Sequence, residues 1–215
     1  MLKECTIREV DILIERYPQL QPLREPLIQS IQMLVDSFST GGKLLICGNG
    51  GSAADSLHIV GELMKDFRSP RKLPEKLGEE LTEMFPEHAA YYLDNLQGAL
   101  PAISLVSETS LTTAYNNDRA ADLSFAQQVL GYGRKGDVLL AISTSGNSTN
   151  VLHAARIARA LGVKVLSLTG DSGGELRPLS DVLLNVPSRI TYQIQELHLP
   201  IYHTICLALE VEIFK

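Results

Sequence analysis

The sequence contains no tryptophan, only three cysteines and no apolar run of membrane-spanning length. Cys5, Cys47 and Cys206 form no C-x-x-C motif, and an odd number of cysteines cannot pair completely within one chain. A membrane span needs about 18 consecutive apolar residues, and the charged N-terminal residues lack the apolar core of a signal peptide. These absences predict a cytoplasmic protein without a membrane partner.

An excess of basic residues is also missing. Lys and Arg number 19 against 25 Asp and Glu, so the net charge is −6. A protein that binds nucleic acid through bulk charge needs a basic face, so we expect no nucleic-acid partner. A chain of 215 residues with 45% hydrophobic residues is long enough for one domain with a sizeable core.

Short apolar runs alternate with helical patterns along most of the chain. The predicted strands cover residues 43–47, 103–106, 137–142, 163–168 and 181–186. Continuously apolar strands that alternate with helices are typical of a parallel sheet covered on both faces. The predicted fold class is α/β, a three-layer α-β-α sandwich with a doubly wound, flavodoxin-like parallel sheet of five strands.

Three further segments are predicted to be helical. Residues 1–40 form an N-terminal helical segment that packs on the core, and residues 41–215 form the main domain. Within that domain, residues 69–98 are rich in proline and charge and contain no strand, so they are predicted to be an insertion or lid with two helical pieces, at residues 75–84 and 88–96. Residues 192–214 predict a long helix that is apolar enough to pack inside the fold or against another subunit.

A glycine-rich run follows the first predicted strand and contains Asn49, Gly50, Gly51 and Ser52. Glycines let the backbone turn sharply and bring amide groups and a helix start onto an anion, which predicts binding of a phosphate or of sugar hydroxyls. A plain strand-to-helix turn capped by Ser52 is the structural alternative. A dinucleotide fingerprint is disfavoured, because the acidic residue it requires about 20 residues later would fall in a helical, charged region.

A second polar loop follows the strand predicted at residues 137–142. It contains the hydroxyl-bearing residues Ser143, Thr144, Ser145 and Ser148. Hydroxyls and backbone N–H groups before a helix can hold phosphate oxygens without any cation. The loop therefore predicts a phosphate site, with an ordinary serine-rich loop as the alternative.

Two pairs of residues could transfer protons or bind a metal. His58 and Glu62 are four residues apart on one predicted helix, and Gln195 and His203 are eight apart on another. If the two helices meet, the four side chains could form an acid–base cluster or a metal site with nitrogen and oxygen ligands. Ordinary core or surface positions are the alternative for these histidines.

The segments CGNGGSAADSLHIVGEL, YNNDRA, GDVLLAISTSGNS, LTGDSGG and IQELHLPIYH, in this order, resemble the sugar isomerase (SIS) domain family and, within it, the phosphoheptose isomerases. This resemblance implies a single SIS domain and an aldose–ketose isomerase. The implied reaction interconverts sedoheptulose 7-phosphate and D-glycero-D-manno-heptose 7-phosphate on the way to activated heptose for surface polysaccharide. It also implies a zinc ion in each subunit and a homotetramer with active sites between subunits.

The resemblance also implies roles for individual residues. Glu62 and His203 would be catalytic, with Glu62 moving a proton between C1 and C2 through an enediol and His203 acting as an acid or base. The implied zinc ligands are His58, Glu62, Gln195 and His203. The implied substrate-binding set is Asn49, Gly50, Gly51, Ser52, Glu62, Asn117, Asp118, Ser143, Thr144, Ser145, Ser148 and Gln195.

The long insertion after Arg68 departs from the family pattern, so another ketose or aldose phosphate stays open as substrate. The alternative to an enzyme is a non-catalytic SIS protein that binds a phosphosugar or a protein partner, similar to the replication-initiator-associating proteins. Such proteins lack the acid–base residues, so the presence of Glu62 and His203 argues for the enzyme.

Overall fold

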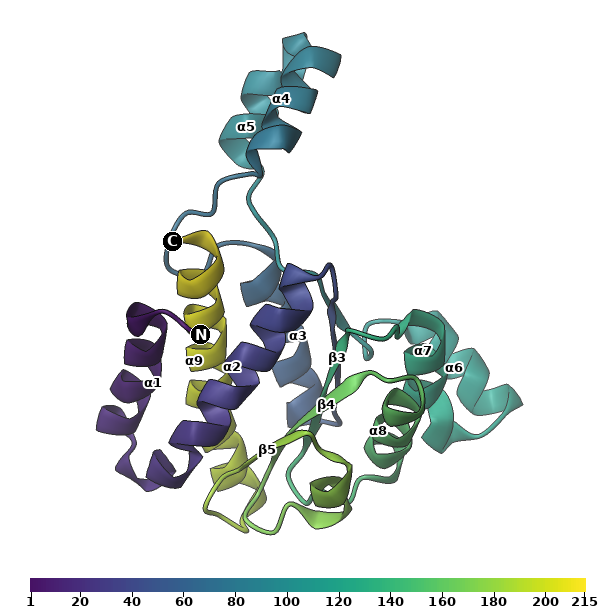
Figure 1. Ribbon diagram of the computed structural model, residues 1–215. Helices are drawn as coiled ribbons and strands as arrows, with labels where there is room; N and C mark the ends of the chain where they lie inside the picture. Colours follow the sequence, from purple (N-terminus) through teal and green to yellow (C-terminus); the bar gives the residue numbers. More distant parts are fainter.

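A five-stranded parallel sheet forms the centre of the computed structural model, which describes residues 1–215 (Figure 1). Its strand order is β2-β1-β3-β4-β5, the order of flavodoxin-like folds, and every pairing is parallel. The predicted fold class is therefore confirmed. The strands are β1 (Leu44–Cys47), β2 (Ala102–Ser104), β3 (Val138–Ser143), β4 (Lys164–Thr169) and β5 (Val182–Asn185).

Both faces of the sheet are buried, which explains why the strands are apolar at nearly every position. In β1, Leu44 and Ile46 belong to one hydrophobic cluster, whereas Leu45 and Cys47 belong to the other. Alternate side chains of a strand point to opposite faces. The first cluster includes side chains of α1 (Glu4–Arg16), α2 (Arg24–Ser39), α3 (Gly51–Met64) and α9 (Thr191–Phe214), and the second includes α7 (Ser124–Tyr132) and α8 (Thr149–Ala160).

The remaining helices are short or lie outside these layers. The helix α6 (Thr109–Asp118) contacts α7, and three 3-10 helices connect other elements: η1 (Pro18–Leu23), η2 (Ala121–Leu123) and η3 (Gly174–Leu179). The sequence patterns did not predict α7, which has only nine residues. A helix of this length is marginal by itself and depends on packing, here of Phe125 and Val129.

The helix α9 occupies the middle of its layer, in contact with α1, α2 and α3. It is long and apolar enough to span a membrane by length and composition alone. Most of its apolar residues, among them Ile201, Tyr202 and Leu209, are instead buried in the hydrophobic core. The expectation that this helix packs inside the fold is confirmed.

The segment predicted as an insertion forms a helical hairpin that projects from the body of the protein (Figure 1). Its helices are α4 (Glu75–Met84) and α5 (Pro86–Asn95), and Ala89 is the only residue of either that is buried. Helix α5 begins at Pro86 rather than at His88, because proline is favoured at the first position of a helix. Both ends of the hairpin return to the end of α3, where the Leu100 N–H donates to the Leu63 carbonyl at 2.9 Å.

Candidate functional site

A cavity of about 270 Å³ lies at the carboxyl edge of the sheet, where β1 and β3 are neighbours. The chain leaves these two strands in opposite directions along the sheet, and open α/β sheets bind ligands at such a switch point. Most of the lining residues belong to the two predicted loops. The complete lining consists of Asn49, Gly50, Gly51, Ser52, Ile142, Ser143, Thr144, Ser148, Thr191 and Gln195.

The glycine loop depends on glycine at two positions. Gly50 has φ +54°, a conformation that side chains with a Cβ rarely adopt, and it precedes the first turn of α3. At Gly51 a Cβ atom would lie 2.3 Å from Nε2 of Gln195. Helix α9 therefore contacts the start of α3 directly, and Gln195 closes one side of the cavity.

The serine loop presents its hydroxyls from the end of β3 to the start of α8. The hydroxyl oxygens of Ser143 and Ser148 are 2.9 Å apart, and both residues line the cavity together with Thr144. Ser145 does not line it. Its hydroxyl instead accepts a hydrogen bond from the backbone N–H of Asn147 and shapes the turn.

The third glycine-rich turn, after β4, supports the serine loop from behind. A Cβ atom at Gly146 would lie 2.1 Å from the carbonyl oxygen of Gly173, so the two backbones touch. The Asn147 side chain accepts a hydrogen bond from the N–H of Glu175 at 2.8 Å. These contacts hold the serine loop in one conformation.

The cavity is suited to an anion although no Lys or Arg lines it. The helices α3 and α8 both begin there, so their unpaired N–H groups and positive dipole ends meet at the same place. Hydroxyls of Ser52, Ser143, Thr144 and Ser148 add further donors. This combination can bind a phosphate group without a basic side chain.

A second group of polar side chains lies where α3 and α9 run side by side. Nε2 of His58 is 3.1 Å from Oε1 of Glu62, and the rings of His58 and His203 pack edge to face with centroids 5.0 Å apart. The structure therefore brings three of the four predicted acid–base or metal residues together. Oε2 of Glu62 and Nε2 of His203 are buried without a hydrogen-bond partner, and the nearest cation, Nζ of Lys65, is 3.7 Å from Oε2.

The surroundings of His203 favour its neutral form. Burial lowers its pKa, the nearby charge of His58 lowers it further, and Glu62 raises it in part. A neutral imidazole has one nitrogen lone pair that can accept a proton or bind a metal. Nε2 of His203 and Oε2 of Glu62 are thus two buried polar atoms without hydrogen bonds. Such atoms destabilise a folded protein unless a ligand binds to them.

The carboxyl-terminal end of α3 is fixed by a buried ion pair between Arg71 and Glu210. Nε of Arg71 donates to Glu210 at 2.9 Å, and both side chains have 0% exposure. The two terminal nitrogens of Arg71 donate to the carbonyls of Leu63 and Glu62, the last turn of α3. An arginine therefore satisfies carbonyls that the end of a helix leaves without partners.

Glu210 is equally well satisfied. It also accepts hydrogen bonds from the N–H groups of Phe67, Arg68 and Ser69. Burial alone would raise its pKa, but these N–H groups and Arg71 together hold the pKa below its ordinary value. The backbone beside Glu62 is thus tied to α9 by a charged, fully hydrogen-bonded contact.

Other predicted site residues lie apart from these two groups. Gln195 lines the phosphate-type cavity, about 12 Å along the axis of α9 from His203 at 1.5 Å per residue. Asn117 and Asp118, at the end of α6, are exposed, do not line the cavity and contact each other at 2.9 Å. No group of three or more His, Cys, Asp or Glu side chains is disposed to hold a metal ion within one chain.

The sequence patterns missed several residues that shape the site. Asn150 and Asn49 exchange two side-chain hydrogen bonds of 2.9 Å across the loops. Tyr202 connects His58 to Asp55. Asp55 stands three residues before His58 and Tyr202 directly before His203, so helical spacing could have raised both as candidates. No local signal identifies partners as distant as Arg71 and Glu210.

Comparison with known proteins gives consistent relatives. A family model for the SIS domain matches residues 82–170. A protein of Helicobacter pylori (strain P12) named phosphoheptose isomerase is 42% identical over 191 residues, which cover 89% of this chain and 86% of that protein. A phosphoheptose isomerase of Aliarcobacter butzleri (strain RM4018) is 39% identical over 90% of this chain and 89% of its own length.

Solved structures of phosphoheptose isomerases are also similar to this chain. The phosphoheptose isomerase GmhA from Neisseria gonorrhoeae matches with a TM-score of 0.71 and 35% identity, covering 96% of this chain and 93% of its own. A phosphoheptose isomerase from Francisella tularensis matches with a TM-score of 0.75 and 31% identity, covering 97% of this chain and 94% of its own. The similarity thus extends over nearly the whole of both chains.

Proposed function

This chain belongs to the phosphoheptose isomerases of the SIS domain family, and we propose that it interconverts sedoheptulose 7-phosphate and D-glycero-D-manno-heptose 7-phosphate. The product would enter the synthesis of activated heptose for surface polysaccharide in the cytoplasm. The observation that carries the proposal is the pairing of an anion cavity at two helix starts with an unsatisfied acid–base pair, Glu62 and His203. Isomerisation of a phosphosugar needs an anion site for its phosphate and an acid–base pair for its proton transfers.

The reaction moves one proton between C1 and C2 and a second between the oxygens on those carbons. The Glu62 carboxylate takes the C–H proton of the carbon next to the carbonyl, which leaves an enediol, and then returns the proton to the other carbon. His203 donates a proton to the carbonyl oxygen and accepts one from the neighbouring hydroxyl. The burial that lowers the pKa of His203 favours the neutral ring, which can accept a proton from the hydroxyl.

The length of the substrate argues that one active site uses two copies of the chain. Three bonds of an extended chain span about 3.8 Å, so the seven bonds from phosphorus to C2 span about 9 Å. Glu62 lies 11 residues beyond Gly51, which is about 16 Å along α3. A phosphate held at the start of α3 therefore leaves C2 several ångströms short of Glu62 in the same chain.

A second copy can supply the missing residues, because the two helices that carry Glu62 and His203 also carry exposed apolar side chains. Leu57, Met64 and Leu199 are exposed on α3 and α9, at 50%, 48% and 42%. Exposed apolar side chains that surround polar ones are typical of protein interfaces. We propose a homotetramer whose active sites lie between subunits, with the phosphate cavity of one subunit facing the Glu62 and His203 of another.

The donor types also suit zinc, although the side chains of a single chain are not arranged around a metal position. His58, Glu62 and His203 offer two nitrogens and a carboxylate, the ligand types that zinc prefers, and two of these groups have buried atoms without partners. Gln195 would join from a neighbouring subunit, which accounts for its distance from His203 within one chain. Bound zinc polarises oxygen atoms of a substrate. Zinc binding and proton transfer remain overlapping proposed roles for Glu62.

Proton exchange tests the proposed activity. In D2O the wild type should place deuterium at C2 of the aldose formed from sedoheptulose 7-phosphate. Glu62→Gln should reduce this exchange by about 10²- to 10⁴-fold, the usual contribution of a general base, while substrate binding measured by calorimetry is retained. Glu15→Gln, at an exposed carboxylate on α1, is the matched control.

The negative outcomes separate the alternatives. Absence of exchange with this substrate and with other ketose phosphates, together with intact binding, would identify a non-catalytic SIS protein. Metal analysis tests the zinc proposal separately. We expect about one zinc per subunit in the wild type and a loss of zinc in the double variant His58→Ala, His203→Ala; a zinc-free wild type would contradict it.

A further inference from the structure

Two asparagine side chains join the two anion-binding loops. Nδ2 of Asn49, in the glycine loop, donates to Oδ1 of Asn150 at 2.9 Å, and Nδ2 of Asn150 donates to Oδ1 of Asn49 at 2.9 Å. No other side-chain hydrogen bond joins residues 48–52 to residues 143–150. Asn49 lines the cavity, whereas Asn150, the second residue of α8, does not. The proposed reaction gives Asn150 no role.

The orientation of both amides follows from the backbone N–H of Val151. This N–H can only donate, and its nitrogen lies 3.0 Å from Oδ1 of Asn150. A flipped Asn150 amide would place its NH2 group against that N–H, so only one orientation forms the bond. A flipped Asn49 amide would then face oxygen with oxygen and nitrogen with nitrogen. The contacts therefore fix both amides and leave Asn49 one hydrogen on Nδ2 and one lone pair on Oδ1 for a ligand.

We propose that Asn150 is a positioning residue for the phosphate site. It pairs with Asn49, holds the starts of α3 and α8 at a fixed separation, and leaves the second Nδ2 hydrogen of Asn49 for an oxygen of the bound phosphate. The proposal rests on the anion cavity of the proposed function but not on its proton transfers, because Asn49 precedes α3 and Glu62 lies in the last turn of that helix.

A pair of amides suits this place in the cavity wall. Each amide has donors and an acceptor, so two of them can pair completely, whereas two carboxylates would repel each other. Amides are also neutral, and a carboxylate here would compete with the phosphate for the N–H groups of the helix starts. No Lys or Arg lines the cavity, so phosphate affinity depends on where N–H groups and hydroxyls are held. The pair holds the two loops that carry them.

A helix cap is the simpler role for Asn150. Its side chain accepts a hydrogen bond from Val151, which carries one of the N–H groups that the start of a helix leaves unpaired. A cap stabilises α8 whether or not Asn49 is present, and it gives no reason for the effects of the two asparagines on phosphate binding to depend on each other. Coupling between their effects on phosphate affinity therefore distinguishes positioning from capping.

A double-mutant cycle measures this coupling. Binding of inorganic phosphate to the full-length protein is followed by calorimetry in the wild type, Asn49→Ala, Asn150→Ala and the double variant. We expect each single variant to bind about 10-fold more weakly, as for the loss of one hydrogen bond to a charged group. The double variant should lose about 10-fold as well, whereas independent residues would give about 100-fold. Asn95→Ala, at an exposed asparagine of the hairpin, is the matched control and should bind like the wild type.

Kinetics supply the second readout. Asn150→Ala should raise KM for sedoheptulose 7-phosphate by about 10-fold and change kcat by less than about threefold, because the pair acts on phosphate binding and not on the proton transfers. A lower kcat at unchanged KM would contradict the proposal. Thermal melting and light scattering check the fold and the oligomeric state of each variant. Asn150→Ser, with the same expected results, replaces Asn150→Ala if the alanine variant does not fold.

The outcomes distinguish this proposal from the proposed function. Independent effects of the two substitutions, wild-type affinity in Asn150→Ala, or a wild type that binds no phosphate would overturn the proposal, even if the protein is an active isomerase. If the effects are coupled but the wild type has no isomerase activity, the proposed function fails and the role of Asn150 in phosphate binding stands.

Discussion

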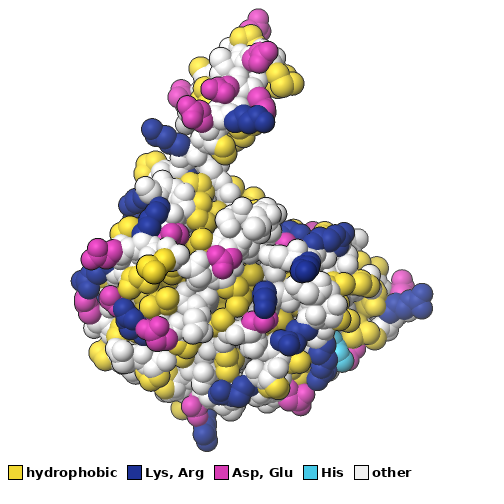
Figure 2. Space-filling model, in the orientation of Figure 1, with side chains coloured by type: hydrophobic (Ala, Val, Ile, Leu, Met, Phe, Trp, Pro, Cys, Tyr) yellow, Lys and Arg dark blue, Asp and Glu magenta, His cyan; other side chains and the backbone are white.

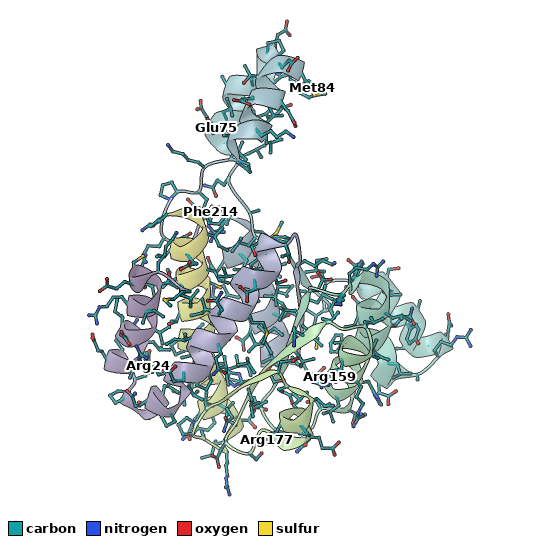
Figure 3. The ribbon with its side chains drawn as sticks, viewed as in Figure 1. Arg24, Glu75, Met84, Arg159, Arg177 and Phe214 are labelled. Carbon is teal, nitrogen blue, oxygen red and sulfur yellow. The ribbon has the colours of Figure 1, made fainter.

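The α4–α5 hairpin and the α3–α9 pair are both built from two neighbouring helices, but they are held in opposite ways. In the hairpin, Lys76 and Glu80 form an ion pair of 3.8 Å within α4, with side chains 87% and 53% exposed. At the end of α3, Arg71 forms an ion pair of 2.9 Å with Glu210 of α9, and neither side chain is exposed. Figure 3 shows Phe214, whose ring lies 5.1 Å beneath the Arg71 guanidinium, at the root from which the hairpin projects.

The two regions also divide the charge of the chain. Residues 75–96 contain six acidic residues and one Lys, a net charge of −5, so the other residues carry −6 + 5 = −1. Figure 2 shows these acidic side chains spread along the projecting hairpin among hydrophobic ones. The body that contains the anion cavity is therefore nearly neutral, and the acidity of the whole chain does not oppose phosphate binding there.

Breaking the two ion pairs should give the largest difference between the regions. Arg71→Met leaves Glu210 buried without its cation, which typically costs about 3–5 kcal/mol. The matched change Lys76→Met removes an exposed pair and should cost less than about 0.5 kcal/mol. Urea unfolding at a fixed protein concentration measures both.

The double variant Arg71→Met, Glu210→Met separates charge from packing. Removing both charges should restore most of the stability, because well-packed apolar residues often replace a buried pair without loss. If Arg71→Met costs no more than Lys76→Met, the Arg71–Glu210 contact does not stabilise the end of α3 as described.

The hairpin and the α3–α9 pair should also differ in how a histidine in each affects the pH dependence of stability. Burial lowers the pKa of His198 on α9 to about 4, and a hydrogen bond with the Thr169 carbonyl offsets this only in part. The unfolded chain, with a pKa of 6.5, then binds more protons between those values, so stability is complete above about pH 6.5 and falls as the pH decreases to about 4. The pKa difference corresponds to about 3 kcal/mol.

Replacement of His198 by glutamine keeps an N–H donor for Thr169 and removes the titration. His198→Gln should therefore reduce the loss of stability between pH 6.5 and 4 by about 3 kcal/mol, as measured by urea unfolding at several pH values. His88→Gln, at an exposed position of the hairpin, should leave the pH profile unchanged. Equal profiles for all three proteins would exclude His198 as the cause.

Removal of the hairpin should have the smallest effect on the fold. Replacing residues 75–96 by a short Gly-Ser linker deletes one buried residue, Ala89. We expect a change of less than about 1 kcal/mol, or about 2–4 °C in Tm for a chain of this size, measured by circular dichroism. A much larger loss, or a change of oligomeric state in light scattering, would show that the hairpin packs against another copy.

The elements that local patterns could predict are those whose causes are local. Apolar runs identified all five strands within one or two residues, and the hairpin helix Glu75–Met84 was predicted with its observed bounds. Helix α7 was missed because its nine residues depend on packing against α8. The loops at residues 48–52 and 143–148 could be predicted to lie at the same edge, since parallel strands all end at one edge of the sheet. That they are neighbours depends on β2 lying on the other side of β1.

Contacts between distant helices could not be predicted in this way. The spacing of His58 and Glu62 placed them on one face of α3, but the rotation of α9 against α3 decided that His203 meets them and that Gln195 meets Gly51. Asn117 and Asp118 show the converse, because their motif did not bring them to the cavity of the same chain.

The sequence by itself determined the strands, the two anion-binding loops and the residue types of an acid–base cluster, because each depends on neighbours within a few residues. Only the tertiary structure decided that Tyr202 reaches His58 and that Arg71 pairs with Glu210. Those contacts join residues 144 and 139 positions apart. They depend on how two helices pack across a shared core, which no local pattern records.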